Sequence, residues 1–193
     1  MHILADLNII SMKVKIYAIL AFIAFGAQSC KNDGKETKAD AATEPAVQKF
    51  FSVEMDVAAE KDDNFAVYYT EDNTINFNGD NAVWSGVKGG NTQQNVVFNL
   101  SEDVIPTHIR LDFGINKEQG DVLLRNLKVS YYGKSFEAKG SEFFKYFIPN
   151  DSVKTEIDQA GGTIKFLKNP KKHFTPFYYP QQAVLDEIGK LTK

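Results

Sequence analysis

Residues 50–59 read FFSVEMDVAA, and apolar and polar side chains alternate within them from Phe51 to Val57. A period of two is typical of a β-strand with one buried face, because successive side chains of a strand point to opposite sides. Five further segments repeat the alternation, centred on Val67, Phe98, Leu111, Val129 and residues 164–166. The pattern predicts a chain of short strands.

Turn-forming residues separate these segments. They stand at positions 78–80, 89–91, 114, 120–121, 133–134 and 161–162. Short strands with turns at this spacing predict an all-β domain, a β-sandwich of two packed antiparallel sheets. Residues 141–147 allow one or two helical turns. At the end of the chain, Pro180 can open a helix whose apolar stripe is Val184, Ile188 and Leu191. We therefore expect a short C-terminal helix docked on the sandwich.

Residues 96–138 carry a more specific pattern. A strand ends at Leu100, and Ile109-Arg110-Leu111-Asp112-Phe113-Gly114, a Gly120-Asp121 turn, Val122-Leu123-Leu124 and Leu127-Lys128-Val129 follow. This stretch resembles a jelly-roll module found in Bacteroidota lipoproteins of unknown function and appended to some membrane glycosyltransferases. The resemblance implies a galactose-binding-like sandwich, and it implies neither catalytic residues nor a settled ligand.

The first residues have the layout of a secretory signal. Met12-Lys13-Val14-Lys15 is a short basic start, an apolar run covers residues 16–27, and Ser29 precedes Cys30. The run is shorter than the roughly 20 residues of a membrane span and fits the apolar region of a cleaved signal. This layout favours Met12 over Met1 as the true start.

Cys30 is the only cysteine and stands where cleavage is expected. Ala27-Gln28-Ser29-Cys30 resembles a bacterial lipoprotein signal in the looser form common in Bacteroidota, which implies lipidation of Cys30. An ordinary signal peptide with an incidental cysteine is the alternative. Lys31-Asn32-Asp33 partly resembles the signal that sends such lipoproteins to the cell surface. We therefore expect an outer-membrane lipoprotein of the cell envelope, anchored by its lipid and surface-exposed rather than facing the periplasm.

The sequence divides into three regions on this interpretation. Residues 1–29 are the signal peptide, residues 30–46 are the lipidated cysteine and a flexible tether, and residues 47–193 are a single sandwich domain. Residues 31–46 contain no aromatic and no large aliphatic side chain, so they cannot contribute to a core.

Composition and motifs narrow the classes of function. The net charge is −3 and the longest basic run is Lys171-Lys172, which gives nucleic-acid binding little electrostatic support. The sequence has no zinc-ligand spacing and no complete nucleophile motif. We therefore expect no metal, no cofactor and no catalysis. A hydrolase that uses two of the many carboxylates is a third hypothesis.

Trp84 is the only tryptophan and lies near Asn81, Asn91 and Gln93 in the sequence. An exposed ring beside amide side chains suits a sugar, because the ring stacks on it and the amides pair with its hydroxyls. The alternative is a core tryptophan beside a polar loop. The pairs Tyr68-Tyr69, Tyr131-Tyr132 and Tyr178-Tyr179 each place one ring on each face of an extended strand, so one ring of each pair can be exposed.

His108, Arg110 and Asp112 share one face of a predicted strand, opposite Ile109, Leu111 and Phe113. That face is either a platform for a polar ligand or a solvated surface with charge pairing between neighbours. Asp151-Ser152-Val153 also resembles a Bacteroidota O-glycosylation acceptor, with Ser152 as the modified residue. Together these features predict a lipid-anchored envelope protein that binds glycan or another envelope ligand. A structural or protein-interaction module of the outer membrane is the alternative.

Overall fold

The structure is a computed structural model that describes residues 48–150, 154–158, 163–167 and 176–193. The described residues belong to one compact unit, Glu44–Lys193, whereas the other unit, Met1–Thr43, lies outside them. Cys30, the tether and Ser152 also lie outside them, so lipidation and glycosylation stay predictions. Within the described part, no helix is long and apolar enough to cross a membrane.

The first sheet is built around β1 and β6, which pair along the whole length of β1. Strand β6 is long enough to take two further partners on its other edge, β7 at one end and β10 at the other. The strands of this sheet are β1 (Ser52–Ala59), β4 (Gln94–Asn99), β6 (Val122–Tyr131), β7 (Lys134–Lys139), β9 (Lys154–Asp158) and β10 (Thr163–Leu167).

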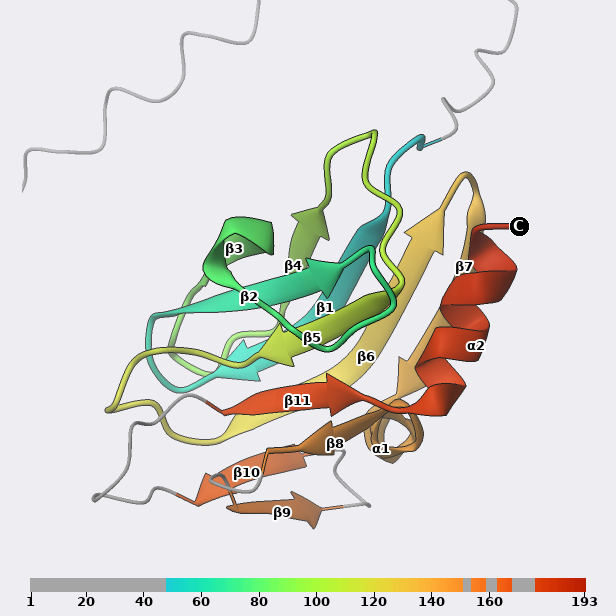
Figure 1. Cartoon of the computed structure of the whole chain (residues 1–193). Coiled ribbons are helices and arrows are strands. Elements are labelled where there is room, and N and C mark those ends of the chain that lie inside the picture. Colours follow the sequence, from blue (N-terminus) through green and yellow to red (C-terminus); the bar gives the residue numbers. More distant parts are fainter. Residues whose placement is uncertain (1–47, 151–153, 159–162, 168–175) are drawn as a thin grey trace, which may run out of the picture. The chain divides into compact units, whose positions relative to one another are not determined.

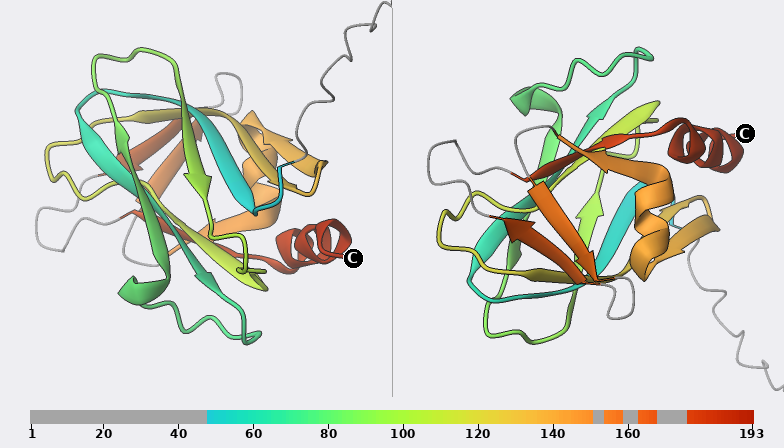
Figure 2. Two further views of the ribbon diagram at one scale, coloured as in Figure 1. Left: turned by 90° about the horizontal axis from the view of Figure 1, so that it is seen from above. Right: turned by 90° about the horizontal axis from the view of Figure 1, so that it is seen from below.

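The second sheet has the order β3-β2-β5-β11-β8. Its strands are β2 (Asp63–Thr70), β3 (Ala82–Val87), β5 (His108–Asp112), β8 (Phe147–Pro149) and β11 (Phe177–Pro180). The described strand pairs are all antiparallel, and the chain crosses repeatedly between the sheets, as in jelly rolls. Figures 1 and 2 show the two layers. The prediction of an antiparallel β-sandwich is confirmed.

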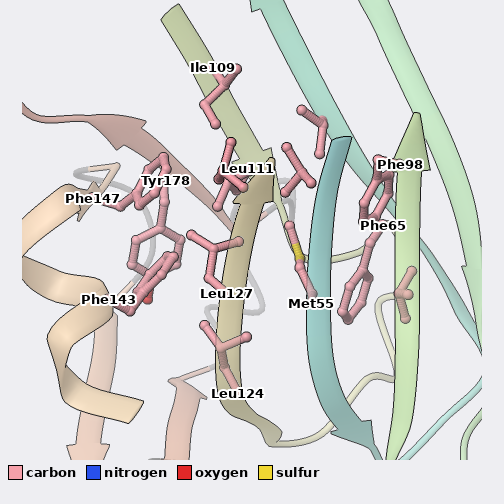
Figure 3. Close-up of a cluster of buried hydrophobic side chains, with 14 of the residues drawn as sticks. Met55, Phe65, Phe98, Ile109, Leu111, Leu124, Leu127, Phe143, Phe147 and Tyr178 are labelled. Atoms are coloured by element: carbon pink, nitrogen blue, oxygen red, sulfur yellow. The ribbon is translucent and has the colours of Figure 1, made fainter. Parts of the chain in front are cut away.

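The core lies between the two sheets and follows from the alternation along the strands. Met55 of β1, Leu127 of β6, and Phe65 and Leu111 of the second sheet are fully buried and meet there (Figure 3). A β-bulge in β6 shifts its register between Asp56 and Val57 of β1. Because of the extra residue, Leu124 and Leu127 both point inward.

Helices are short and lie at the edge of the sandwich. They are η1 (Gly79–Asn81), η2 (Gly140–Glu142), α1 (Phe143–Tyr146) and α2 (Gln182–Leu191). Val184, Ile188 and Leu191 of α2 are buried, so the predicted apolar stripe is confirmed. Pro180 does not open this helix. It ends β11 instead, paired with Phe147, because proline is tolerated at the end of a strand.

Candidate functional site

The outward side chains of the second sheet form rows that cross its strands. In one row the successive partners are Trp84, Ala66, Asp112 and Phe177, and in the next Tyr68 pairs with Arg110. A loop after β2 adds one more aromatic ring. We call the residues that meet here the aromatic face: Tyr68, Phe77, Trp84, Arg110, Asp112, Phe177 and Tyr179.

Arg110 and Asp112 form a bidentate ion pair on this face. Nε and Nη2 of Arg110 donate to Oδ1 and Oδ2 of Asp112, each at 2.8 Å. Their side chains are only 16% and 2% exposed. The expected charge pairing along β5 is confirmed, whereas the expectation of a solvated surface is wrong for Asp112. Its row places it beside Phe177, and Arg110 covers both of its oxygens, so little water reaches the carboxylate.

Three aromatic rings surround the Arg110 guanidinium. Its central carbon lies 4.0 Å from the centre of the Tyr68 ring, 4.6 Å from that of Phe177 and 5.5 Å from that of Phe77. These are cation–π distances, and such contacts strengthen when water is excluded. The third nitrogen, Nη1, has no hydrogen-bond acceptor among the described residues. The described residues therefore leave the N–H groups of Nη1 without a hydrogen bond.

Trp84 is the most exposed ring of the aromatic face, at 45%. The interpretation of Trp84 as a core residue is wrong, because Val83 and Val87 occupy the inward positions of β3. The Trp84 ring packs edge-on against Tyr68, with 6.0 Å between ring centres and 73° between the planes. A strand position and a packed neighbour hold this exposed ring in place.

A small residue on β2, Ala66, makes room for these large side chains. Ala66 stands between Trp84 and Asp112 in its row and is completely buried. Tyr68 follows two positions later and faces the same way, while Tyr69 packs against the core. The expectation of one ring on each strand face is therefore confirmed for this pair, as it is for buried Tyr178 and outward Tyr179.

Of the amides predicted to surround Trp84, Gln93 binds another part of the molecule. Gln93 donates from Nε2 to Asp56 of β1, in the first sheet. The Asn91 backbone N–H donates to the Ala59 carbonyl at 2.8 Å. Asn81 ends η1, just before β3. The prediction of an amide cluster is wrong for Gln93, because the chain crosses to the other sheet between β3 and β4 and the Gln93 amide binds there.

His108 lies on the same face as Arg110, one row farther along β5, where its partner is Thr70. Its Nδ1 is 3.2 Å from Oγ1 of Thr107. Burial lowers the pKa of His108 below its ordinary value, and the charge of Asp72 opposes this effect. The ring is therefore a neutral polar group at neutral pH.

Burial acts in the opposite direction on Asp112. Removal from water raises the pKa of this carboxyl above its ordinary value, and the Arg110 hydrogen bonds and charge only partly counteract the rise. Since both oxygens already accept from Arg110, Asp112 orients the guanidinium and is not a free acid or base.

Sequence reasoning missed the parts of the site that come from distant segments. Phe177 and Phe77 were not predicted as site residues, although both contact Arg110. The alternation in β11 around buried Tyr178 is the signal that places Phe177 outward. Nothing in the sequence near Phe77 indicates its contact.

The aromatic face combines the exposed ring of Trp84 and several half-buried rings with one cation held by an ion pair. Over the described ranges, no group of three His, Cys, Asp or Glu side chains is placed to hold a metal ion. Comparisons with protein-family models, curated proteins and solved structures each find no match to this chain. The arrangement itself suits a ligand that has apolar C–H faces and hydrogen-bond acceptors.

Proposed function

We propose that this chain is a lipid-anchored cell-envelope protein whose sandwich binds a glycan on the aromatic face. The observation that carries the proposal is the Trp84 ring, 45% exposed on a strand and packed against Tyr68. A ring fixed in this way loses little conformational entropy when a ligand stacks on it. Sugars have the matching chemistry, because C–H faces stack on aromatic rings and hydroxyls accept and donate hydrogen bonds.

Arg110 supports the same proposal. Asp112 and two rings within 4.6 Å hold its guanidinium in one orientation. A ligand that accepts a hydrogen bond from Nη1 would therefore meet a preorganised donor. The ion pair also supports binding without catalysis, since the Asp112 oxygens are engaged and cannot act as a glycosidase acid or nucleophile. The proposed location in the envelope depends on the signal and on Cys30.

A protein partner is the second candidate. Ile148 pairs with Tyr179 at the far end of the aromatic face and is 47% exposed. An exposed apolar residue that continues a row of rings suits a protein surface better than a sugar. Ile148 therefore favours an interaction module of the outer membrane if no glycan binds.

The glycan proposal is tested with the full-length chain, purified in detergent, on an array of bacterial and host glycans. Binding should fall at least about tenfold in Trp84→Ala. The control is Tyr132→Asn, because Tyr132 is a similarly exposed ring, 51%, on the β6–β7 turn, and asparagine tolerates its φ of 47°. Silence across the array, or equal losses in both variants, overturns the proposal.

The lipid anchor is tested separately. Cys30→Ala should move the protein from the membrane fraction to the soluble fraction, because the acyl chains that hold it cannot be attached. Retention of the variant in the membrane fraction would overturn the anchor.

A further inference from the structure

The outer face of the second sheet becomes a polar hollow beyond Trp84. Gly86 follows Trp84 by two positions on β3 and therefore faces the same way, about 7 Å farther along the strand. The hollow has a volume of about 380 Å³, within the range of small-ligand sites. Its lining residues are Asp62, Asp63, Asn64, Gly86, Val87, Lys88, Ile115 and Asn116.

Gly86 leaves the floor of this hollow open, although the fold does not require glycine there. A Cβ at this position would have one neighbour, Oδ1 of Asn64 at 3.9 Å, which is ordinary contact. By contrast, a Cβ at Gly114 or Gly120 would lie 2.2 Å or 1.9 Å from a carboxylate oxygen. Glycine weakens a strand and often marks close approach of a ligand. The glycine therefore leaves space in which a ligand can approach the backbone of β3.

The walls of the hollow carry two amide side chains. Asn64 is the direct partner of Gly86 and is exposed, and its side-chain amide has no hydrogen bond within the described part of the chain. Asn116 is held in place, because its Nδ2 donates to the Asp62 carbonyl and its Oδ1 accepts from the Glu118 N–H, both at 2.9 Å. Amides beside an open floor suit hydroxyl groups, because each amide both donates and accepts hydrogen bonds.

A charged pair and an apolar side chain complete the rim. Nζ of Lys88 lies 3.2 Å from Oδ2 of Asp62, and Oδ1 of Asp62 accepts from the Gly89 N–H at 2.7 Å. That amide and Lys88 hold the pKa of Asp62 below its ordinary value, so the carboxylate stays an acceptor. Ile115 is 51% exposed and offers an apolar surface that the C–H face of a ligand can contact.

We infer that the hollow over Gly86 is a second sugar subsite, so that the ligand is an oligosaccharide with one unit stacked on Trp84 and the next above Gly86. This inference rests on the proposed glycan-binding function. Trp84 supplies most of the apolar contact, and Asn64, Asn116 and Asp62 recognise the hydroxyls of the second unit. A monosaccharide fills only the Trp84 position and binds more weakly.

The test uses the full-length chain and matched mono-, di- and trisaccharides of glucose, galactose, mannose and N-acetylglucosamine. The wild type should bind di- and trisaccharides at least about tenfold more tightly than the matching monosaccharide. Gly86→Val, which fills the floor, should abolish this gain and leave monosaccharide binding unchanged. Asn64→Leu fills the same space from β2 and should act alike, and Gly86→Ala should have an intermediate effect. Circular dichroism and thermal melting confirm that each variant is folded.

The outcomes separate the two claims. If wild type and Gly86→Val bind every sugar equally while Trp84→Ala does not bind, the second subsite is wrong and the aromatic face is still the glycan site. The same holds if monosaccharides bind as tightly as trisaccharides. If the wild type binds no saccharide of any length, the proposed function fails and the subsite fails with it.

Discussion

The guanidinium carbon of Arg110 lies 4.0 Å from the centre of the Tyr68 ring, and the two residues are direct partners in the β2–β5 pairing. The register of β2 and β5 therefore places the Arg110 guanidinium on the Tyr68 ring. Asp112, two residues farther along β5, binds the same guanidinium through its carboxylate. The organisation of the aromatic face depends on this arrangement.

Replacement of Arg110 should test how far the buried pair supports the fold. Arg110→Met leaves the Asp112 carboxylate 2% exposed and unpaired, so we expect the free energy of unfolding to fall by about 3–5 kcal/mol. Urea denaturation measures the change. Arg125→Met is the matched control, because Arg125 is exposed on β6, and it should change stability by less than about 0.5 kcal/mol.

The double variant Arg110→Met/Asp112→Leu should recover much of the lost stability, since it removes both buried charges. Equal losses in the single and double variants would show instead that ring contacts to the guanidinium, and not the uncompensated charge, account for the change.

The stability of the protein should depend on pH through Asp112 in a direction opposite to that of most carboxylates. Burial raises its folded pKa above the ordinary value of 3.8, so the protonated form favours folding. This contribution is complete below pH 3.8 and is lost as the pH rises through the folded pKa. The wild type should therefore lose stability relative to Asp112→Asn as the pH rises through that window.

Urea denaturation of both proteins at a series of pH values from about 3.5 to about 6.5 gives this difference. Asp62 and Asp72 have lowered pKa values, but they titrate in both proteins and cancel in the comparison. A difference that grows in favour of the wild type with rising pH would mean that Arg110, and not burial, dominates the pKa of Asp112.

Gly114 should tolerate no side chain. Its φ is +112°, and a Cβ would lie 2.2 Å from Oδ2 of Asp63. Asp63 holds the loop after β5, because its Oδ1 accepts from the N–H groups of Ile115 and Asn116 at 2.8 and 3.0 Å. Gly114→Ala should therefore reduce the free energy of unfolding by more than about 1 kcal/mol.

Hydrogen exchange should also show faster exchange at the Ile115 and Asn116 amides in Gly114→Ala. Gly79→Ala serves as the control, since a Cβ there has no atom within 4 Å, and its stability should change by less than about 0.5 kcal/mol. A Gly114→Ala protein as stable as this control would contradict the close contact with Asp63.

Alternation made much of the fold predictable. In β1, β2 and β5 large apolar residues recur at every second position, and Met55, Phe65 and Leu111 among them are fully buried, so the period of the sequence matches the period of the strand. Strand β3 has a weaker signal, because Trp84 and Gly86 occupy its outward positions and neither is polar. An outward face without polar side chains departs from the alternation that predicts strands.

Which residues meet in the candidate site depends on the order of the strands in the sheet. The alternation within one segment does not reveal that order. Arg110 meets Tyr68 and Phe177 only because β5 pairs with both β2 and β11. Nearness in sequence was misleading for the same reason, since Gln93 lies close to Trp84 along the chain but binds Asp56 of the first sheet. The burial of Asp112 also follows from its row of neighbours rather than from its own segment.

The C-terminal helix should be part of the cooperative fold. Ile188 lies on the buried stripe of α2 and is 3% exposed. Gln181, the residue before the helix, binds α1 twice. Its backbone N–H donates to the Tyr146 carbonyl at 2.7 Å, and its side-chain Nε2 donates to the Phe144 carbonyl at 2.8 Å. Ile188→Ala should therefore cost about 2–5 kcal/mol in urea denaturation. The cost arises because the cavity left behind lies in the same core as Leu191.

Lys190→Ala is the control on the exposed face of the same helix. Its ion pair with Glu187, at 2.8 Å, leaves the Lys190 side chain 69% exposed, so the change should stay within about 0.5 kcal/mol. If Ile188→Ala is as stable as Lys190→Ala, α2 is not docked on the core. If Ile188→Ala instead unfolds in two transitions, of which only the helical signal is shifted, α2 docks as a separate unit and the sandwich folds without it.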